Sequence, residues 1–427
     1  MRLETFIGGG LLGATLALGA TDCNDYLTVN NPNVVNAGSI NPQTDATTLS
    51  KSAQQDFIQA DMWMGEFSSF LVGESWPAET QPAFTEFGLR SVTNTNTSLA
   101  QIFGYVSVAV VANDQVLASL KGTAGEASNV NVARSALFAG YALVLMGEDF
   151  CQGVINGGPP LTSAQVLDTA IAQFTRAIAD GKAVTGAGAA EAATLVTAAY
   201  VGRARAELQR GLLPAAIADA GQVPASFTYN LLNVNDPGNK GRDNNRFYVA
   251  SQDRATIVVP PAWGGVTAAG VTGVDPRVPV LPPGAAGRPM VAINSFTPDF
   301  SQNKYPSYGS PVRLASGLEA QYIAAEAGGV GTQLALIQAQ RAANRLAAYS
   351  GPTDPASVLA EFEEQRGFEF YLEGKRLGDF RRNGSAVQHV PVTGQPNFNP
   401  QLGVEGSQTC LPLPSVETLN NPNFKGS

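Results

Sequence analysis

The stretch that decides the fold class is QRGFEFYLEGKRLGDFRR, residues 365–382. Five of its charged residues follow one another at spacings of three or four, which place side chains on one face of a helix. A pair of catalytic carboxylates is one interpretation. Each acid has an arginine at partner spacing and apolar neighbours, however, which favours a structural ion network that orients the last helix. The residues of this predicted network are Arg366, Glu369, Glu373, Arg376 and Asp379.

Other short phrases surround this stretch in a fixed order along the chain. Before it come DPR at 275–277, KYP at 304–306, PVRLASGLEA at 311–320 and AEA at 325–327. After it come LPLP at 411–414, Glu417, and NNPN at 420–423. Each phrase alone is weak evidence of relationship to a protein family, whereas their order over the C-terminal half of the chain is specific evidence.

Together with the Cys23–Asn33 opening, these phrases resemble the SusD/RagB family of outer-membrane nutrient-binding lipoproteins over nearly the whole chain. The resemblance implies a mainly α fold, a tetratricopeptide-like helix-pair scaffold with long irregular loops and few short strands. It also implies a partner, a TonB-dependent barrel transporter of the SusC type, for which this protein would serve as a hinged lid. Members of the family capture oligosaccharides and some serve peptide import, so the ligand class stays open.

The N-terminus has the features of an export signal. Arg2 precedes an apolar run of 14 residues, Ile7–Ala20, which is too short to cross a bilayer and has the size of a signal-peptide core. The cysteine that follows predicts a lipoprotein-type signal peptide at 1–22 and acylation of Cys23, which would anchor the protein in the outer membrane, facing the cell exterior. Asp22 departs from the small residues usual before a lipidated cysteine, so an ordinary signal peptide cleaved elsewhere is the alternative.

Two cysteines remain if Cys23 carries lipid. Export implies an oxidising route, which favours a disulfide between Cys151 and Cys410 over two separate buried thiols. Such a bond would tie the C-terminal tail to the helical core and, in the chain-entropy model, contribute roughly 4 to 5 kcal/mol.

Helical periodicity dominates two blocks of the chain, which we expect to form one domain over 23–427. The patterns predict helices near 52–70, 98–120, 131–146, 163–180 and 191–210, and again near 316–327, 332–349 and 356–372. The scaffold therefore covers about 50–213 and 316–382. Ala170, Phe174 and Ala177 have the offsets of the second helix of a tetratricopeptide repeat. Between the blocks, about 221–312, proline and glycine predict long loops on the ligand side.

Composition and motifs argue against several chemistries. The net charge is −9 with no basic run, which gives nucleic-acid binding no support. His389 is the single histidine, which excludes a histidine-rich zinc site, and the chain has no nucleophile elbow or phosphate-binding glycine loop. We therefore expect no catalytic residue, metal or cofactor. A surface hydrolase that uses two acids and a repeat scaffold that only assembles other proteins are the alternatives.

Ligand contacts are expected from aromatic rings in loops or at helix ends, with amides beside them for hydroxyl groups. Most tryptophans are core residues, which is the competing interpretation for each of these rings. The candidates are Trp76, Phe84, Asn244, Phe247, Tyr248, Trp263 and Tyr308.

Overall fold

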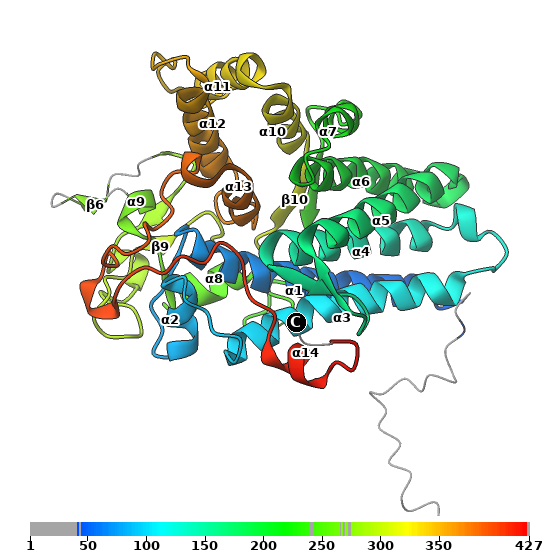
Figure 1. Cartoon of the computed structure of the whole chain (residues 1–427), viewed down its shortest axis with the longest axis horizontal. Helices are drawn as coiled ribbons and strands as arrows, with labels where there is room; N and C mark the ends of the chain where they lie inside the picture. Colours follow the sequence, from blue (N-terminus) through cyan, green and yellow to red (C-terminus); the bar gives the residue numbers. More distant parts are fainter. Residues whose placement is uncertain are drawn as a thin grey trace, which may run out of the picture. The chain divides into compact units, whose positions relative to one another are not determined.

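Helices of the first block pack on one another in chain order, with α4 in the centre (Figure 1). Nearly every residue of α4 is buried, because α1, α3, α5 and α6 all pack against it. A Cβ on Gly140 of α4 or Gly202 of α6 would overlap the ring of Phe174, so these glycines let the ring insert between two helices. The helices are α1 (Ala46–Leu71), α2 (Pro82–Gly88), α3 (Thr97–Leu120), α4 (Val130–Asp149), α5 (Ser163–Ala183), α6 (Ala189–Gln209) and α7 (Leu213–Ala220).

The computed structural model describes residues 41, 44–238, 242–264, 266–267, 270–271 and 275–424. Ala46–Ser427 forms one unit. The predicted signal peptide and the predicted lipidation site Cys23 lie outside the described residues. Helices α3 and α4 are long and apolar enough to cross a membrane, but 94% of the apolar window of α4 is buried within the protein. The apolar composition of α4 therefore serves the core.

A second helical block packs onto the first through α10, which contacts α6 and α7. Successive helices then pair, α10 with α11 and α11 with α12, as expected for stacked helix pairs. The tail after α13 returns along the first block and ends in a short helix (Figure 1). The helices are α10 (Gly317–Gly328), α11 (Val330–Ala343), α12 (Pro355–Glu369), α13 (Arg376–Asn383) and α14 (Ser415–Asn420).

Irregular chain with short elements separates the two blocks, as predicted for 221–312. Within the described residues every sheet is an antiparallel pair of strands. The pairs are β1 (Trp76–Pro77) with β5 (Ile257–Val258), β2 (Gln152–Val154) with β3 (Pro160–Thr162), β4 (Thr228–Leu231) with β10 (Val312–Ser316), β6 (Val266–Thr267) with β7 (Gly270–Val271), and β8 (Val280–Leu281) with β9 (Ser301–Gln302). Short helical turns are α8 (Arg246–Tyr248), η5 (Val249–Asp253) and α9 (Pro261–Gly264).

The predicted helices are confirmed with shifted ends, but one central prediction is wrong. Residues 365–382 do not form one helix, so the charged residues do not share one helix face. Helix α12 ends at Glu369, and the chain turns through Leu372 and Gly374, whose φ angles are 54° and 65°, before α13 begins at Arg376. Left-handed backbone interrupts a right-handed helix.

The predicted disulfide is present. Cys151 and Cys410 are bonded with their Cα atoms 5.1 Å apart, across a sequence separation of 259 residues. Main-chain hydrogen bonds lie on both sides of it, since Cys151 N donates to Leu411 O at 2.8 Å and Leu411 N donates to Asp149 O at 2.8 Å. The tail is therefore attached to the end of α4 both covalently and by a short parallel bridge.

Candidate functional site

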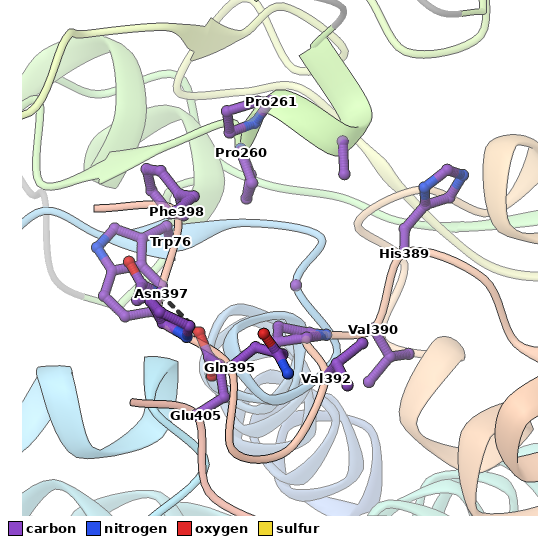
Figure 2. A pocket seen from close by; sticks show the side chains of 14 residues that line it. Trp76, Pro260, Pro261, His389, Val390, Val392, Gln395, Asn397, Phe398 and Glu405 are labelled. Carbon is purple, nitrogen blue, oxygen red and sulfur yellow. Dashed lines mark hydrogen bonds between the residues drawn. The ribbon is translucent and has the colours of Figure 1, made fainter. Parts of the chain in front are cut away.

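Three segments distant in sequence enclose a cavity of about 430 Å³. They are the chain after α1, the start of α9, and the loop that follows α13 (Figure 2). Half of its lining residues carry rings, and rigid rings form a cavity that exists before a ligand arrives. The lining residues are Gly73, Trp76, Pro260, Pro261, Ala262, His389, Val390, Pro391, Val392, Gln395, Pro396, Asn397, Phe398 and Glu405.

The inner wall is the ring of Trp76, which the β1–β5 pair holds in place. Trp76 lies opposite Val258 in that pair and is only 2% exposed. Its ring belongs to a small apolar cluster with Val258 and Ala292, and Phe398 packs edge-on against it with ring centroids 5.4 Å apart. Phe398 is 42% exposed, so it covers the tryptophan from the solvent side. An edge-on pair of this kind fixes both rings.

The outer wall is a hairpin within 391–408, which we call the wall loop. Gly394 N donates to Glu405 O at 2.8 Å, and Glu405 N donates to Gln395 O at 2.9 Å. Asn397 N donates to Gly403 O at 3.0 Å, which closes the turn that carries Phe398. The wall loop therefore has its own backbone pairing, although it contains no long strand.

Polar side chains in the cavity are few, and two of them, Asn397 and Glu405, pair with each other, whereas Trp76 Nε1 and His389 Nε2 are buried with no hydrogen-bond partner in the part of the chain that the structure describes. The Asn397 side chain donates to Glu405 Oε1 at 2.7 Å, which is the contact drawn in Figure 2, and its oxygen accepts from Asn399 N at 2.9 Å. Glu405 is 5% exposed, and its Oε2 is buried with no hydrogen-bond partner among the described residues. Burial raises the pKa of Glu405, against the lowering effects of Asn397 and Arg90. Gln395 is exposed at the rim.

His389 lies at the opposite end of the cavity from Trp76 (Figure 2). Its ring packs beside that of Trp263, with centroids 5.2 Å apart, and its Nε2 lies 3.7 Å from Glu364. The residue has a φ of 64°. The sequence placed this histidine in a loop, and the structure adds that it lines the cavity.

The prediction of ligand contact is wrong for three of the rings. Phe84, Phe247 and Trp263 are 7%, 1% and 0% exposed and belong to the main apolar core. Trp263 packs against Phe368 and Tyr371 of the second helical block, so its ring joins loop to scaffold. The competing interpretation of these rings as core residues is therefore correct.

Asn244 has a structural role in place of the predicted ligand contact. It is 5% exposed, and its amide donates to Val234 O at 2.6 Å and Asp236 O at 3.0 Å, which holds the preceding loop. Tyr248 and Tyr308 form an edge-on pair with centroids 4.7 Å apart and are half-buried. The Tyr308 hydroxyl donates to Asp253 at 2.8 Å. Neither tyrosine lines the cavity.

Most residues of the cavity, including Phe398 and the prolines around it, were not predicted from the sequence. These residues lie in irregular segments where periodicity carries no information. The density of proline, glycine and asparagine in 389–405 was the available signal, since such composition predicts a structured loop.

The predicted ion network exists, but with different partners, because the chain turns between α12 and α13. Glu373 pairs with Lys304 at 2.7 Å, Arg313 at 2.9 Å and Lys375 at 3.5 Å. Burial alone would raise the pKa of Glu373, but the charges of Lys304 and Arg313 outweigh it and lower that pKa to about 2. The carboxylate is therefore fully paired.

The other members of the network link α12 to α13 and to the loops. Arg366 pairs with Asp379 at 2.8 Å, and Asp379 also pairs with Arg382 at 2.9 Å. Glu369 lies 3.6 Å from Arg277 and 3.8 Å from Arg313. Arg376 has its guanidinium 4.9 Å from the centroid of the Trp263 ring. Over the described part of the chain, no group of three or more His, Cys, Asp or Glu side chains has a metal-binding arrangement.

Solved structures similar to this chain cover nearly all of it. A SusD/RagB family protein from Bacteroides thetaiotaomicron aligns with a TM-score of 0.63 at 14% identity, over 91% of this chain and 96% of that one. A surface glycan-binding protein A from the same species aligns with a TM-score of 0.65 at 12% identity, over 90% and 98%. A SusD-like carbohydrate-binding protein from Bacteroides fragilis aligns with a TM-score of 0.62 at 13% identity, over 90% and 99%.

No protein-family model and no curated protein matches the sequence. At these sequence identities, structural similarity shows the fold alone. It agrees with the helix pairs, the short strand pairs and the long loops described above. The chain therefore has the SusD-like fold, as its resemblance to the SusD/RagB family predicted.

Proposed function

We propose that this protein is a glycan-binding lipoprotein of the cell surface, anchored in the outer membrane through Cys23. In this proposal it captures an oligosaccharide and acts as the lid of a TonB-dependent barrel transporter of the SusC type. The partner would supply the energy for transport, and this chain would supply ligand contacts and an opening motion. It would perform no catalytic step.

The observation that carries the proposal is the ring-walled cavity within a SusD-like fold. Aromatic rings pack on the apolar parts of sugars, and rigid walls lower the entropy cost of binding. Phe398 supplies an exposed ring that covers the buried Trp76, and Gln395 supplies an accessible amide at the rim. Tyr248 and Tyr308 stay candidates for a second contact region.

Pairing of the acids also supports binding without catalysis. The carboxylates that first suggested chemistry, Glu369 and Glu373, lie against Arg277, Arg313 and Lys304. A glycosidase acid must hold a raised pKa and its partner must stay free to act on the sugar. Incubation of the purified protein with polysaccharide and peptide pools tests this point, and the appearance of any product would contradict it.

Calorimetry with oligosaccharide pools tests the binding site. We expect Phe398→Ala to weaken binding about tenfold, because it removes the ring that covers Trp76. Phe296→Ala is the matched control, since Phe296 is also 42% exposed and lines a different cleft. Loss of binding in the Phe296 variant alone would show that the ligand binds in that other cleft.

Purification from native membranes tests the partner and the anchor. We expect the protein to co-purify with a large outer-membrane barrel, and Cys23→Ser to release it into the soluble fraction. Isolation of the unsubstituted protein as a free soluble species would contradict both parts of the proposal.

A further inference from the structure

We infer that the cavity takes an acyl group carried by the ligand, while the sugar ring that bears it stays at the rim. This inference rests on the proposed glycan function and names the class of glycan: one substituted with O-linked or N-linked acyl groups, such as acetyl. The hydrogen-bonding groups that the walls offer distinguish an acyl group from an unsubstituted sugar ring.

Prolines reduce the number of backbone donors in the walls. Pro260, Pro261, Pro391 and Pro396 all line the cavity, and proline has no backbone N–H. An unsubstituted sugar ring carries a hydroxyl group on most of its carbons, and each one needs a partner when water is removed. Leaving a buried polar group unpaired costs about 1–3 kcal/mol. Several unpaired hydroxyl groups would cancel the gain from stacking on the rings.

Among the polar side chains that line the cavity, Asn397 is committed, whereas Trp76 Nε1 and His389 Nε2 are buried with no hydrogen-bond partner among the described residues. Asn397 donates to Glu405 and accepts from Asn399 N, so its amide is satisfied without ligand. Glu405 Oε2 is covered by protein atoms and does not reach the open space. Gln395 is the exposed side chain at the rim, and its amide N–H groups can donate to an acyl carbonyl.

An acyl group fits the apolar surface and the few polar groups of these walls. Its methyl or longer apolar end gains about 0.8 kcal/mol for each buried CH₂ group, and its carbonyl oxygen needs one donor. The volume of about 430 Å³ lies at the small end of ligand cavities, which limits how much of a chain of sugar rings can enter. The hydroxyl groups of the ring would then remain in water.

Matched glycan pairs test the inference with the full chain. An array would carry acetylated xylan beside the same xylan after mild alkali, which removes O-acyl esters, and N-acetylchitohexaose beside chitohexaose. We expect at least one acylated member to bind about tenfold more tightly than its deacylated partner, and the pair affected distinguishes an O-acyl from an N-acyl ligand. Equal or tighter binding of the deacylated members would overturn the acyl assignment and leave the glycan function in place. No binding to any member would overturn the acyl assignment, and calorimetry with oligosaccharide pools decides the glycan function separately.

Substitutions test whether the preference for acylated glycans arises at this cavity. Phe398→Ala should remove the preference for the acylated member, and Phe296→Ala should keep it. Val392→Asp is a second variant, because Val392 lines the cavity, is 66% exposed and should tolerate a charge without misfolding. An acyl preference that survives both cavity variants would place the acyl site elsewhere and overturn the inference.

Discussion

The guanidinium of Arg90 donates from Nε to the main-chain oxygen of Gln408 at 3.0 Å. The same guanidinium donates from Nη1 to the main-chain oxygen of Pro391 at 2.5 Å, so one side chain holds both ends of the wall loop. Gln408 completes the attachment, since its side chain accepts from Val92 N and donates to Val92 O. Arg90 itself is 3% exposed and has a φ of 52°. A distant residue after α2 therefore positions the outer wall of the cavity.

Arg90→Ala should loosen the wall loop without unfolding the scaffold. It removes two charge-assisted hydrogen bonds to backbone, each worth about 1.5–3 kcal/mol, and we expect faster amide exchange in 391–408 and about tenfold weaker ligand binding. Hydrogen exchange and calorimetry measure the two effects. Arg345→Ala is the matched control, because Arg345 is exposed and also has a positive φ, 59°. Unchanged exchange in 391–408 would show that Arg90 does not hold the loop.

A second prediction concerns the close approach at the end of the same loop. Gly406 N donates to Leu89 O at 2.7 Å, and a Cβ on Gly406 would overlap the carbonyl oxygen of Arg90. Gly406→Ala must therefore push the wall loop away from 89–90, and we expect a loss of about 1–3 kcal/mol in the free energy of unfolding. Gly104→Ala is the control, since nothing lies within 4 Å of its Cβ position on α3 and alanine favours helix. Equal stability of the two variants would contradict the packing argument.

The disulfide should matter for stability more than for the shape of the cavity. Replacing Cys151 and Cys410 together by serine should lower the free energy of unfolding by about 2–5 kcal/mol, because the unfolded chain regains the freedom of a very long loop. Thermal unfolding with and without dithiothreitol measures the effect. The reductant should lower the Tm of the unsubstituted protein and leave the double variant unchanged. A Tm that does not respond to reductant in the unsubstituted protein would contradict the prediction.

Helical periodicity made the scaffold predictable, because each helix buries one continuous face. Ala170, Phe174 and Ala177, picked from their offsets alone, are all fully buried. The turn at Leu372 and Gly374 was not predictable in this way. Spacings of three and four in 365–382 are equally compatible with one helix or with two helices and a turn, and only tertiary packing decides between them.

The cavity was less predictable than the scaffold for a related reason. Its walls combine residues near 76, 261 and 398, and only the folded chain brings such segments together. Trp263 shows the limit of composition, since a tryptophan flanked by proline and glycine looked like a surface ring. The structure buries it between Arg376 and Phe368 instead. The cysteine pair was predictable because the count of cysteines leaves few alternatives.

A final prediction follows from Glu363, which is buried beside Asp379 and Glu326. Burial, and then the charges of those two acids, raise the pKa of Glu363 from 4.5 to about 8. In the unfolded chain this group loses its proton near pH 4.5, whereas the folded protein keeps it until about pH 8. The folded state therefore binds the extra proton between these values, and stability must fall as the pH rises through this window. Glu373, with its pKa lowered to about 2, acts in the opposite direction and stabilises the fold above about pH 4.5.

Glu363→Gln removes the titrating group and keeps an oxygen that can accept from Asn383, which donates to Glu363 at 2.7 Å. Since each unit of raised pKa corresponds to about 1.4 kcal/mol, we expect the variant to recover at least about 1 kcal/mol of the stability lost between pH 5 and pH 8. Urea unfolding at the two pH values measures the difference. Glu364→Gln, one residue along the same helix with a side chain 34% exposed, should keep the decline. A Glu363 variant that loses as much stability as the unsubstituted protein would show that the carboxyl is ionised within the fold.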